Sequence, residues 1–399
     1  MKILIIVSST AQLSMFKVLI KELENFNIKF INTGIPFKKE IKELLKRYGV
    51  NFETIERCNI KSANEVLIRE KPDIMLTGHD QTPMEIFFIE AANSLGIPSL
   101  TVQDGIISAE KNPVSLEKKI KYLLKIPLKF INLFLIQKIS LRYLLDFAIF
   151  KIKYYNKYLF LYGHGNSTII ALFGESTRKM LISEGINPKK LVVTGNPKFD
   201  KLKQYNDINM KERLRNRWNI PKEKFVVLLL TQQFVEAEIW VPAQRKELIS
   251  VISQSVSDLK DAHLIIKLHP PYEKEENYIE ILKNFSISYS ILNEEPLEEI
   301  LSLSDVALTV SSTAALEAMA LKKPVMIINL FNENQPLFYK DSGAIYITNK
   351  NEVTLNLKNL SLGKGFDFKK IDKFLFEQTF KIDGKASKRI ANLIVKMVK

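Results

Sequence analysis

Short, continuous runs of apolar residues alternate along the chain with longer stretches in which apolar residues recur every three or four positions. Continuous runs of this length are typical of strands buried on both faces, and the longer period predicts helices. The alternation of the two indicates parallel sheets covered by helices. In the first half we expect strands at 2–9, 28–34, 73–80, 97–105, 167–174 and 190–197, and helices at 12–25, 38–47, 83–96 and before 184.

A second alternation begins near residue 224. It predicts strands at 224–233, 263–271, 286–292, 305–312, 324–330 and 343–348, separated by helical patterns. The fold class is therefore α/β, with two tandem doubly wound Rossmann-like domains facing a cleft at the carboxyl ends of their strands. The expected divisions are a first domain at 1–205, a linker at 206–224, a second domain at 225–385 and an amphipathic helix at 386–399 that could cross back to the first domain.

The charge is uneven. The chain of 399 residues carries a formal net charge of +14, and between Glu117 and Lys157 ten basic residues stand against two acidic ones. Lysines spaced among Leu, Ile, Phe and Tyr are typical of a helix lying on an anionic lipid surface, so the segment 116–160 predicts contact with an anionic membrane. Core helices with solvated lysines are the equally weighted alternative. No stretch is apolar for long enough to span a bilayer, and no RNA-binding signature supports a nucleic-acid partner.

The number and spacing of the cysteines and histidines limit which disulfides and metal sites the chain can form. The single cysteine, Cys58, excludes an intramolecular disulfide and suits a reducing compartment, so we expect a cytoplasmic protein on the inner face of the cell membrane. Four scattered histidines with no metal-binding spacing predict that no metal is bound. Catalysis must then come from side chains at strand ends.

In the second domain, His269 and Pro270 close one strand, and Ser311, Ser312 and Thr313 lie between another strand and an alanine-rich helix. Hydroxyls and free N–H groups at a helix start suit a phosphate, although one of them could simply cap the helix. Glu317 could reach ribose hydroxyls. Gln232 and Gln233 end a third strand and could touch phosphate or sugar, or be ordinary surface residues.

In the first domain, Asp104 and Gly105 end the strand at 97–105. A carboxylate there could serve as general base for an acceptor hydroxyl, while glycine lets a substrate approach the backbone. His79 and Asp80, after the strand at 73–80, occupy a similar position and are the second choice. An Asp-Gly pair alone is mostly a turn signal.

The layout resembles that of GT-B glycosyltransferases. Asp104-Gly105, His269-Pro270 and Ser311-Ser312 resemble the D/E-D/E-G, HP and S-S/T motifs of bacterial sialyltransferases and related Kdo transferases, with Gln103 in place of the first acid. The segment VVTGNPKFD at 192–200 also resembles CDP-glycerol glycerophosphotransferases and non-hydrolysing UDP-GlcNAc 2-epimerases. The resemblance implies that Asp104 is the general base, that His269 donates to the departing phosphate, and that the two serines hold the nucleotide phosphate.

Three activities remain open. The first is an inverting, metal-independent glycosyltransferase that uses a nucleotide sugar, with a CMP-sialic acid or Kdo-like donor favoured, and a glycan or glycolipid acceptor in surface polysaccharide synthesis; the donor is a substrate and no cofactor is expected. The second is a CDP-glycerol-type polyol-phosphate transferase. The third is a UDP-sugar 2-epimerase, which would be expected to have a THR-type loop where this chain has LTQQF and SGG where it has SST. A non-enzymatic nucleotide-binding module is the remaining alternative.

Overall fold

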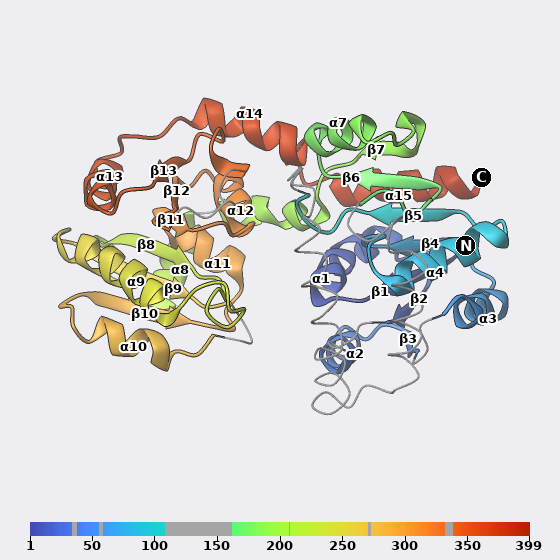
Figure 1. Ribbon diagram of the computed structural model, residues 1–399, viewed down its shortest axis with the longest axis horizontal. Coiled ribbons are helices and arrows are strands. Elements are labelled where there is room, and N and C mark those ends of the chain that lie inside the picture. The colour runs from blue at the N-terminus through green and yellow to red at the C-terminus, as the bar shows by residue number, and fades with distance from the viewer. Residues whose placement is uncertain (34–37, 56–58, 108–161, 207, 270–272, 332–337) are drawn as a thin grey trace, which may run out of the picture. The chain divides into compact units, whose positions relative to one another are not determined.

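The computed structural model describes residues 1–33, 38–55, 59–107, 162–206, 208–269, 273–331 and 338–399. The described chain divides into two compact units (Figure 1). Unit 1 contains Met1–Asp200 together with Gln378–Lys399, and unit 2 contains Lys201–Glu377. The basic segment 116–160 lies outside the described residues, so its predicted membrane contact stays a prediction.

Unit 1 is built on a seven-stranded parallel sheet in the order β3-β2-β1-β4-β5-β6-β7. The central strands are almost wholly buried and mainly apolar, as expected for strands covered on both faces. Their bounds are β1 (Lys2–Val7), β2 (Asn27–Asn32), β3 (Phe52–Thr54), β4 (Ile74–Thr77), β5 (Ser99–Val102), β6 (Ile169–Leu172) and β7 (Leu191–Val193).

Helices cover both faces of this sheet. Leu13 and Phe16 of α1 share one apolar cluster with Ile390 of α15, while Val66 of α3 and Phe88 of α4 belong to a separate cluster. The helices are α1 (Thr10–Leu19), α2 (Lys38–Arg47), α3 (Ile60–Glu70), α4 (Pro83–Ser94), α7 (Glu175–Ser183) and α15 (Ala386–Val398), with short 3-10 turns at Ile20–Leu23, Pro188–Lys190 and Pro197–Asn206. The C-terminal helix α15 therefore completes the core of the N-terminal unit (Figure 1).

Unit 2 has a six-stranded parallel sheet in the order β10-β9-β8-β11-β12-β13. Its strands are β8 (Phe225–Leu230), β9 (Ala262–Lys267), β10 (Ser288–Leu292), β11 (Val306–Thr309), β12 (Val325–Ile328) and β13 (Ile345–Ile347). Its helices are α8 (Ile208–Arg217), α9 (Pro242–Ser257), α10 (Glu276–Leu282), α11 (Leu297–Leu303), α12 (Ala314–Ala320), α13 (Asn351–Ser361) and α14 (Phe368–Thr379), the last of which ends two residues beyond the unit. The α/β class with two Rossmann-like domains is confirmed.

The division between the units differs from the expected one. Residues 206–224, taken from sequence as a linker, lie within unit 2, and the unit ends at Glu377 rather than at residue 385. The side chain of Arg215 donates to the backbone carbonyls of Pro221, Lys222 and Lys224 at 2.6, 3.1 and 3.0 Å. These hydrogen bonds lie within the segment itself; Arg215, only 5% exposed, also pairs with Asp305 at 3.3 Å, and this pair holds the segment against the rest of unit 2.

No helix in the described part of the chain is long and apolar enough to cross a bilayer.

Candidate functional site

The carboxyl ends of β1, β4 and β5 lie side by side in unit 1, because these strands are parallel neighbours. Ser8 follows β1, His79 follows β4, and Asp104 follows β5. The positively charged side chain of Lys198 also contributes to the electrostatic field at Asp104. The topology thus brings two of the predicted residues, His79 and Asp104, to one edge of one sheet.

Burial raises the pKa of Asp104 above its ordinary value of 3.8. His79, Lys198 and a hydrogen bond from Gln12 act in the opposite direction, and the nearby carboxyl of Glu85 adds to the rise. A carboxylate with a raised pKa is a better proton acceptor, which is what a general base requires. A methyl group added at the adjacent Gly105 would meet no described atom within 4 Å.

We expected Asp80 to contact the substrate, but in the structure its carboxylate holds a loop in place. It is 1% exposed, and its two carboxylate oxygens accept hydrogen bonds from the backbone N–H groups of Gly163 at 2.9 Å and Gly165 at 2.7 Å. A Cβ at Gly165 would lie 2.6 Å from the Asp80 Cβ, so only glycine fits at this approach. Both oxygens are already used to hold the loop that precedes β6.

Two residues of this edge, Glu85 and Gln12, were missed from the sequence. Glu85 of α4 is fully buried; its Oε1 accepts a short hydrogen bond from the Ser8 hydroxyl and lies 3.8 Å from Nδ1 of His79. Gln12 accepts the Ser8 N–H at 2.7 Å and packs so closely on Gly78 that a Cβ there would lie 2.4 Å from Gln12 Cγ. The signal for Glu85 was that it is one of two acids in the otherwise apolar helical run MEIFFIEAA.

In unit 2, Gln232 and Ser311 follow the neighbouring strands β8 and β11 and pair with each other. The Gln232 amide nitrogen donates to the Ser311 hydroxyl, and the Ser311 N–H donates to the Gln232 amide oxygen, both at 2.8 Å. Gln233, by contrast, contributes its backbone carbonyl to the loop, accepting from Ala237 at 2.8 Å. Two predicted residues are therefore joined directly, and the third lies beside them.

The residues before α12, Ser311, Ser312 and Thr313, already form some hydrogen bonds with other groups of the protein. The N–H of Ser312 donates to the Thr309 hydroxyl at 3.2 Å, and the Ser312 hydroxyl accepts from the N–H of Ala314 at 3.3 Å. Thr313 is the residue that precedes the helix, and its side chain makes no capping hydrogen bond. The N–H groups of Ser311 and Ser312 therefore have protein partners, whereas Thr313 is exposed.

Glu317 lies one turn into α12 and is partly buried, near the buried phenol of Tyr339. That phenol donates to the backbone carbonyl of Ser312 at 2.9 Å and so fixes the turn from the far side.

His269 lies two residues beyond the end of β9 and is exposed; its predicted companion Pro270 lies outside the described residues. The backbone N–H of His269 donates to Oε2 of Glu273 at 2.8 Å. Glu273 is 3% exposed and is a third residue that the sequence did not single out.

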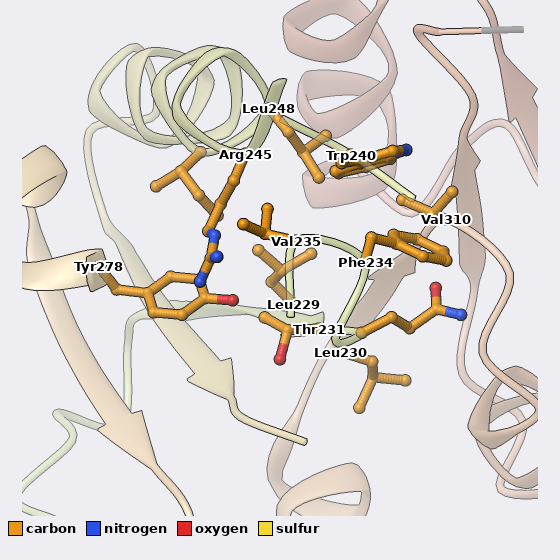
Figure 2. Close-up of a pocket in the computed structure, with 12 residues that line it drawn as sticks. Leu229, Leu230, Thr231, Phe234, Val235, Trp240, Arg245, Leu248, Tyr278 and Val310 are labelled. Carbon is orange, nitrogen blue, oxygen red and sulfur yellow. The ribbon is translucent and has the colours of Figure 1, made fainter. Parts of the chain in front are cut away.

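A pocket opens beneath the loop between β8 and α9, beside Gln232 (Figure 2). Its cavity volume is about 20 Å³, close to what a single water molecule needs, and its lining is mainly apolar. The rings of Phe234 and Trp240 pack at 4.6 Å on one side, and Arg245, paired with Glu236 at 2.8 Å, lines another.

Similar solved structures define the fold class of this chain. Among solved structures, the UDP-GlcNAc 2-epimerase from Neisseria meningitidis bound to UDP-GlcNAc is 16% identical, covers 99% of this chain and 100% of its own, and superposes with a TM-score of 0.65. The S. aureus MnaA–UDP structure is 19% identical over 98% of this chain and 95% of its own (TM-score 0.62). The wall teichoic acid polymerase TagF with CDPG is 15% identical over 100% of this chain and 88% of its own (TM-score 0.57). At these identities the likeness establishes the fold, a GT-B-like pair of Rossmann-like domains.

The family follows from the sequence. The family model described as UDP-N-acetylglucosamine 2-epimerase matches residues 166–395, and the chain belongs to this enzyme family. A curated relative, the teichoic acid poly(ribitol-phosphate) polymerase of Bacillus spizizenii, is 24% identical over 241 residues. That match covers 58% of this chain but only 38% of the polymerase, so the chain spans well under half of its relative's length.

These findings favour the two alternative activities over the first. The epimerase family and the teichoic acid polymerases correspond to the UDP-sugar 2-epimerase and the polyol-phosphate transferase, whereas none of them supports a CMP-sialic acid or Kdo-like donor.

Proposed function

We propose that this protein is a transferase of cell-surface polymer biosynthesis that takes a CDP-activated polyol phosphate, or a related nucleotide sugar, and transfers the activated group to an acceptor hydroxyl. The observation that carries the proposal is Asp104, a carboxyl with a raised pKa at the end of β5, beside Gly105, where an added methyl group would meet no described atom within 4 Å. A general base is what an acceptor hydroxyl needs before it can attack. The polymerase relatives support the polyol-phosphate donor.

In this reaction Asp104 removes the proton of the acceptor hydroxyl, and the hydroxyl oxygen attacks the distal phosphorus of the donor. The bond from that phosphorus to the bridging oxygen breaks, and CMP leaves with the electron pair. His269 donates a hydrogen bond to the departing phosphate, while the Gln232–Ser311 pair and the exposed Thr313 hydroxyl hold the nucleotide. With a sugar donor the same base would serve, and attack would fall on the anomeric carbon.

The proposal includes an acceptor at the membrane. The basic segment 116–160, outside the described residues, would hold the protein on anionic lipid at the cytoplasmic leaflet, where a glycan or glycolipid acceptor is reached. Reversing the charges of its lysines should release the protein from anionic vesicles in a sedimentation assay, while unchanged binding would remove this part of the proposal.

A UDP-sugar 2-epimerase is the second candidate, favoured by the family match over 166–395. Such an enzyme inverts one carbon of the sugar and needs no acceptor. This chain, however, has LTQQF at 230–234 and SST at 311–313, where the resemblance would lead one to expect THR and SGG. Gln232 and Ser311 bond to each other, so these departures lie together in the fold.

The experiment begins with thermal unfolding in the presence of CMP, CDP, UDP or GDP at matched concentrations, because a ligand that binds only the folded state raises Tm with its affinity. We expect the cytidine nucleotides to stabilise most, and Gln232→Ala to reduce that effect. The protein is then incubated with CDP-glycerol, or CDP-ribitol, and a glycerol-phosphate oligomer, and separately with UDP-GlcNAc alone.

Release of CMP that depends on the acceptor and is lost in Asp104→Asn supports the transferase. Formation of the C2 epimer of UDP-GlcNAc without an acceptor supports the second candidate instead. No stabilisation by any of the nucleotides would refute both.

A further inference from the structure

Glu273 lies at the centre of a buried hydrogen-bond network that joins the ends of two strands in unit 2. Its Oε2 accepts the backbone N–H of His269 at 2.8 Å and lies in a short hydrogen bond with the Thr231 hydroxyl. Its Oε1 accepts a short hydrogen bond from the phenol of Tyr278. Thr231 immediately follows β8, and His269 follows the adjacent β9, so one carboxylate spans the exits of both strands.

The groups around this carboxylate are themselves held in place. Tyr278 is 2% exposed, and the guanidinium of Arg245 lies 5.5 Å from the centre of its ring. The Thr231 hydroxyl also lies 2.9 Å from the carbonyl of Lys267, the last residue of β9. Burial, reinforced by the negative charge of Glu273, raises the pKa of Tyr278, so the phenol keeps its proton and remains a donor. The carboxylate is therefore oriented from two sides before it meets His269.

A carboxylate that is only 3% exposed requires such partners, because a buried charge without hydrogen bonds is costly. The His269 N–H belongs to the backbone of an exposed residue beyond the end of the strand, where no ladder hydrogen bond would fix it. The carboxylate supplies the missing acceptor. The His269 side chain is exposed, while its backbone N–H is hydrogen-bonded to the buried Glu273 carboxylate. This hydrogen bond fixes the backbone position from which the imidazole extends.

We propose that Glu273 is a positioning residue, which fixes the backbone at His269 so that the imidazole meets the departing phosphate. This inference rests on the proposed function, in which His269 donates to that phosphate. Glu273 touches no substrate itself and acts only through His269. The alternative is a purely structural carboxylate, whose loss would lower stability but leave turnover by the folded protein unchanged.

The test uses the full chain with His269→Ala, Glu273→Ala, Glu273→Gln and the double variant His269→Ala/Glu273→Ala. Glu275→Ala, an exposed glutamate two residues away, is the matched control. We expect Glu273→Ala to lower kcat by about 10²-fold, the scale expected when a reacting group is misplaced by about 1 Å, with the Kd for CDP within about threefold of wild type. Glu273→Gln should recover most of the loss, because its amide oxygen can still accept the His269 N–H.

The double variant distinguishes positioning from structure. If Glu273 acts through His269, the double variant should be no slower than His269→Ala alone; if it acts independently, the two losses multiply. Multiplying losses, or wild-type kcat in folded Glu273→Ala, would overturn the inference. Should Glu273→Ala fail to fold, Thr231→Val and Tyr278→Phe each remove one of its anchors, and wild-type kcat in both would be equally contrary.

A second readout does not depend on the reaction. The chain has four histidines, so the imidazole Cε1–H signal that disappears in His269→Ala can be assigned in a proton–carbon NMR spectrum. We expect that signal to shift in Glu273→Ala and not in Glu275→Ala. A shift with no effect of His269→Ala on turnover would mean that the proposed role of His269 is wrong although the anchoring exists; no shift would mean that the anchoring itself is wrong.

Discussion

Asp104 and Asp80 lie at the same edge of the sheet in unit 1 but have different roles. Burial raises the pKa of both carboxyls, but the two oxygens of Asp80 are bonded to glycine amides, whereas Asp104 lies next to Gly105, where an added methyl group would meet no described atom within 4 Å. The same side-chain chemistry is thus available to a ligand in one place and used up by the fold in the other. Replacing each with asparagine separates function from structure.

For Asp104→Asn we expect turnover to fall by about 10²–10⁴-fold, the usual contribution of a general base, while Tm stays near that of wild type. In the wild-type protein the base works only when deprotonated, so activity should fall as the pH drops through a pKa above 3.8. Initial rates across pH, together with melting curves, measure both effects.

For Asp80→Asn we expect the opposite result: Tm should fall, and turnover by the folded protein should stay near that of wild type. One of the two glycine N–H groups would face the amide NH₂ instead of an oxygen, which costs about 1–3 kcal/mol for a buried donor left unpaired. A clear loss of Tm in Asp104→Asn, with none in Asp80→Asn, would contradict this division.

Gly165→Ala and Gly105→Ala form a second contrasting pair. The added methyl at Gly165 would lie 2.6 Å from the Asp80 Cβ, so we expect a loss of about 1–3 kcal/mol from overpacking. At Gly105 it would meet nothing described within 4 Å, so stability should hold. Urea unfolding measures both.

If an acceptor approaches the backbone beside Asp104, Gly105→Ala should still raise KM for that acceptor. An unchanged KM would mean that the acceptor does not approach the backbone at this position.

The residues that sequence reasoning found and those it missed differ in a physical way. Asp104, His269 and Ser311 were predicted because they follow apolar runs and because strand ends in parallel sheets are where ligands bind; their roles stay predictions. Glu273 and Glu85 owe their importance to partners: Glu273 to Thr231, 42 residues earlier, and Glu85 to Ser8, 77 residues earlier. No local pattern indicates such a pairing.

At the scale of elements, a cluster of charges ties β1, β2 and the end of α3 together. Glu70 accepts from Lys29 at 2.7 Å, from Lys2 at 2.9 Å and from Arg69 at 3.0 Å, with Glu53 bonded to Lys29 on the far side. The hydrogen bond from Lys29, the largest influence, and those from Lys2 and Arg69 lower the pKa of Glu70 from 4.5 to about 2, although burial opposes them.

This cluster predicts an acid dependence of stability. Because the pKa of Glu70 is lower in the folded than in the unfolded chain, its contribution is complete above pH 4.5 and is lost as the pH falls from about 4.5 to about 2. Glu70→Gln should lower the free energy of unfolding at pH 7 by ~1–2 kcal/mol, a value reduced for solvent screening, and the difference from wild type should vanish near pH 2.

Glu65→Gln, on the exposed face of the same helix, is the matched control and should change stability little at any pH. Denaturant unfolding at several pH values checks both variants. A Glu70→Gln deficit that persisted undiminished at pH 2 would exclude charge pairing as its cause.

The sequence did not reveal the short strand β3 or the helices α3, α8, α13 and α14. β3 is three residues long at the sheet edge, too short for an alternating or continuous apolar pattern. The charged segment INMKERLRNR forms α8, although it reads as a polar connection, because Arg215 and Lys211 bond to Asp305, which in turn accepts the Val226 N–H. Long apolar runs needed no such help, which is why both sheets were predictable.

At the scale of the whole molecule, the chain leaves unit 1 after Asp200 and returns to it at Gln378. The return is secured at both ends. Asp200 accepts the N–H groups of Ala386 at 2.9 Å and Ser387 at 2.7 Å, which caps the start of α15, and Ile390 and Ile394 are fully buried against α1. Distant segments of the chain are therefore one folding unit.

Ile390→Ala should destabilise unit 1 by about 2–5 kcal/mol, the cost of emptying a buried aliphatic site. Leu355→Ala, at a position 60% exposed in α13, is the matched control and should cost little. Both tryptophans, Trp218 and Trp240, lie in unit 2, so far-UV circular dichroism, which senses both units, is the measurement. Equal losses in the two variants would mean that α15 adds nothing to the core.

This split arrangement sets an order of completion during synthesis. A chain made from its N-terminus has all of unit 2, residues 201–377, before the helix that closes unit 1 exists. Until 378–399 emerge, the nascent protein presents Leu13, Phe16 and their neighbours without a cover. Of these two units, the one begun first is thus finished last. A chain cut short after residue 377 would have a complete unit 2 and an incomplete unit 1 with exposed apolar residues, which favours aggregation.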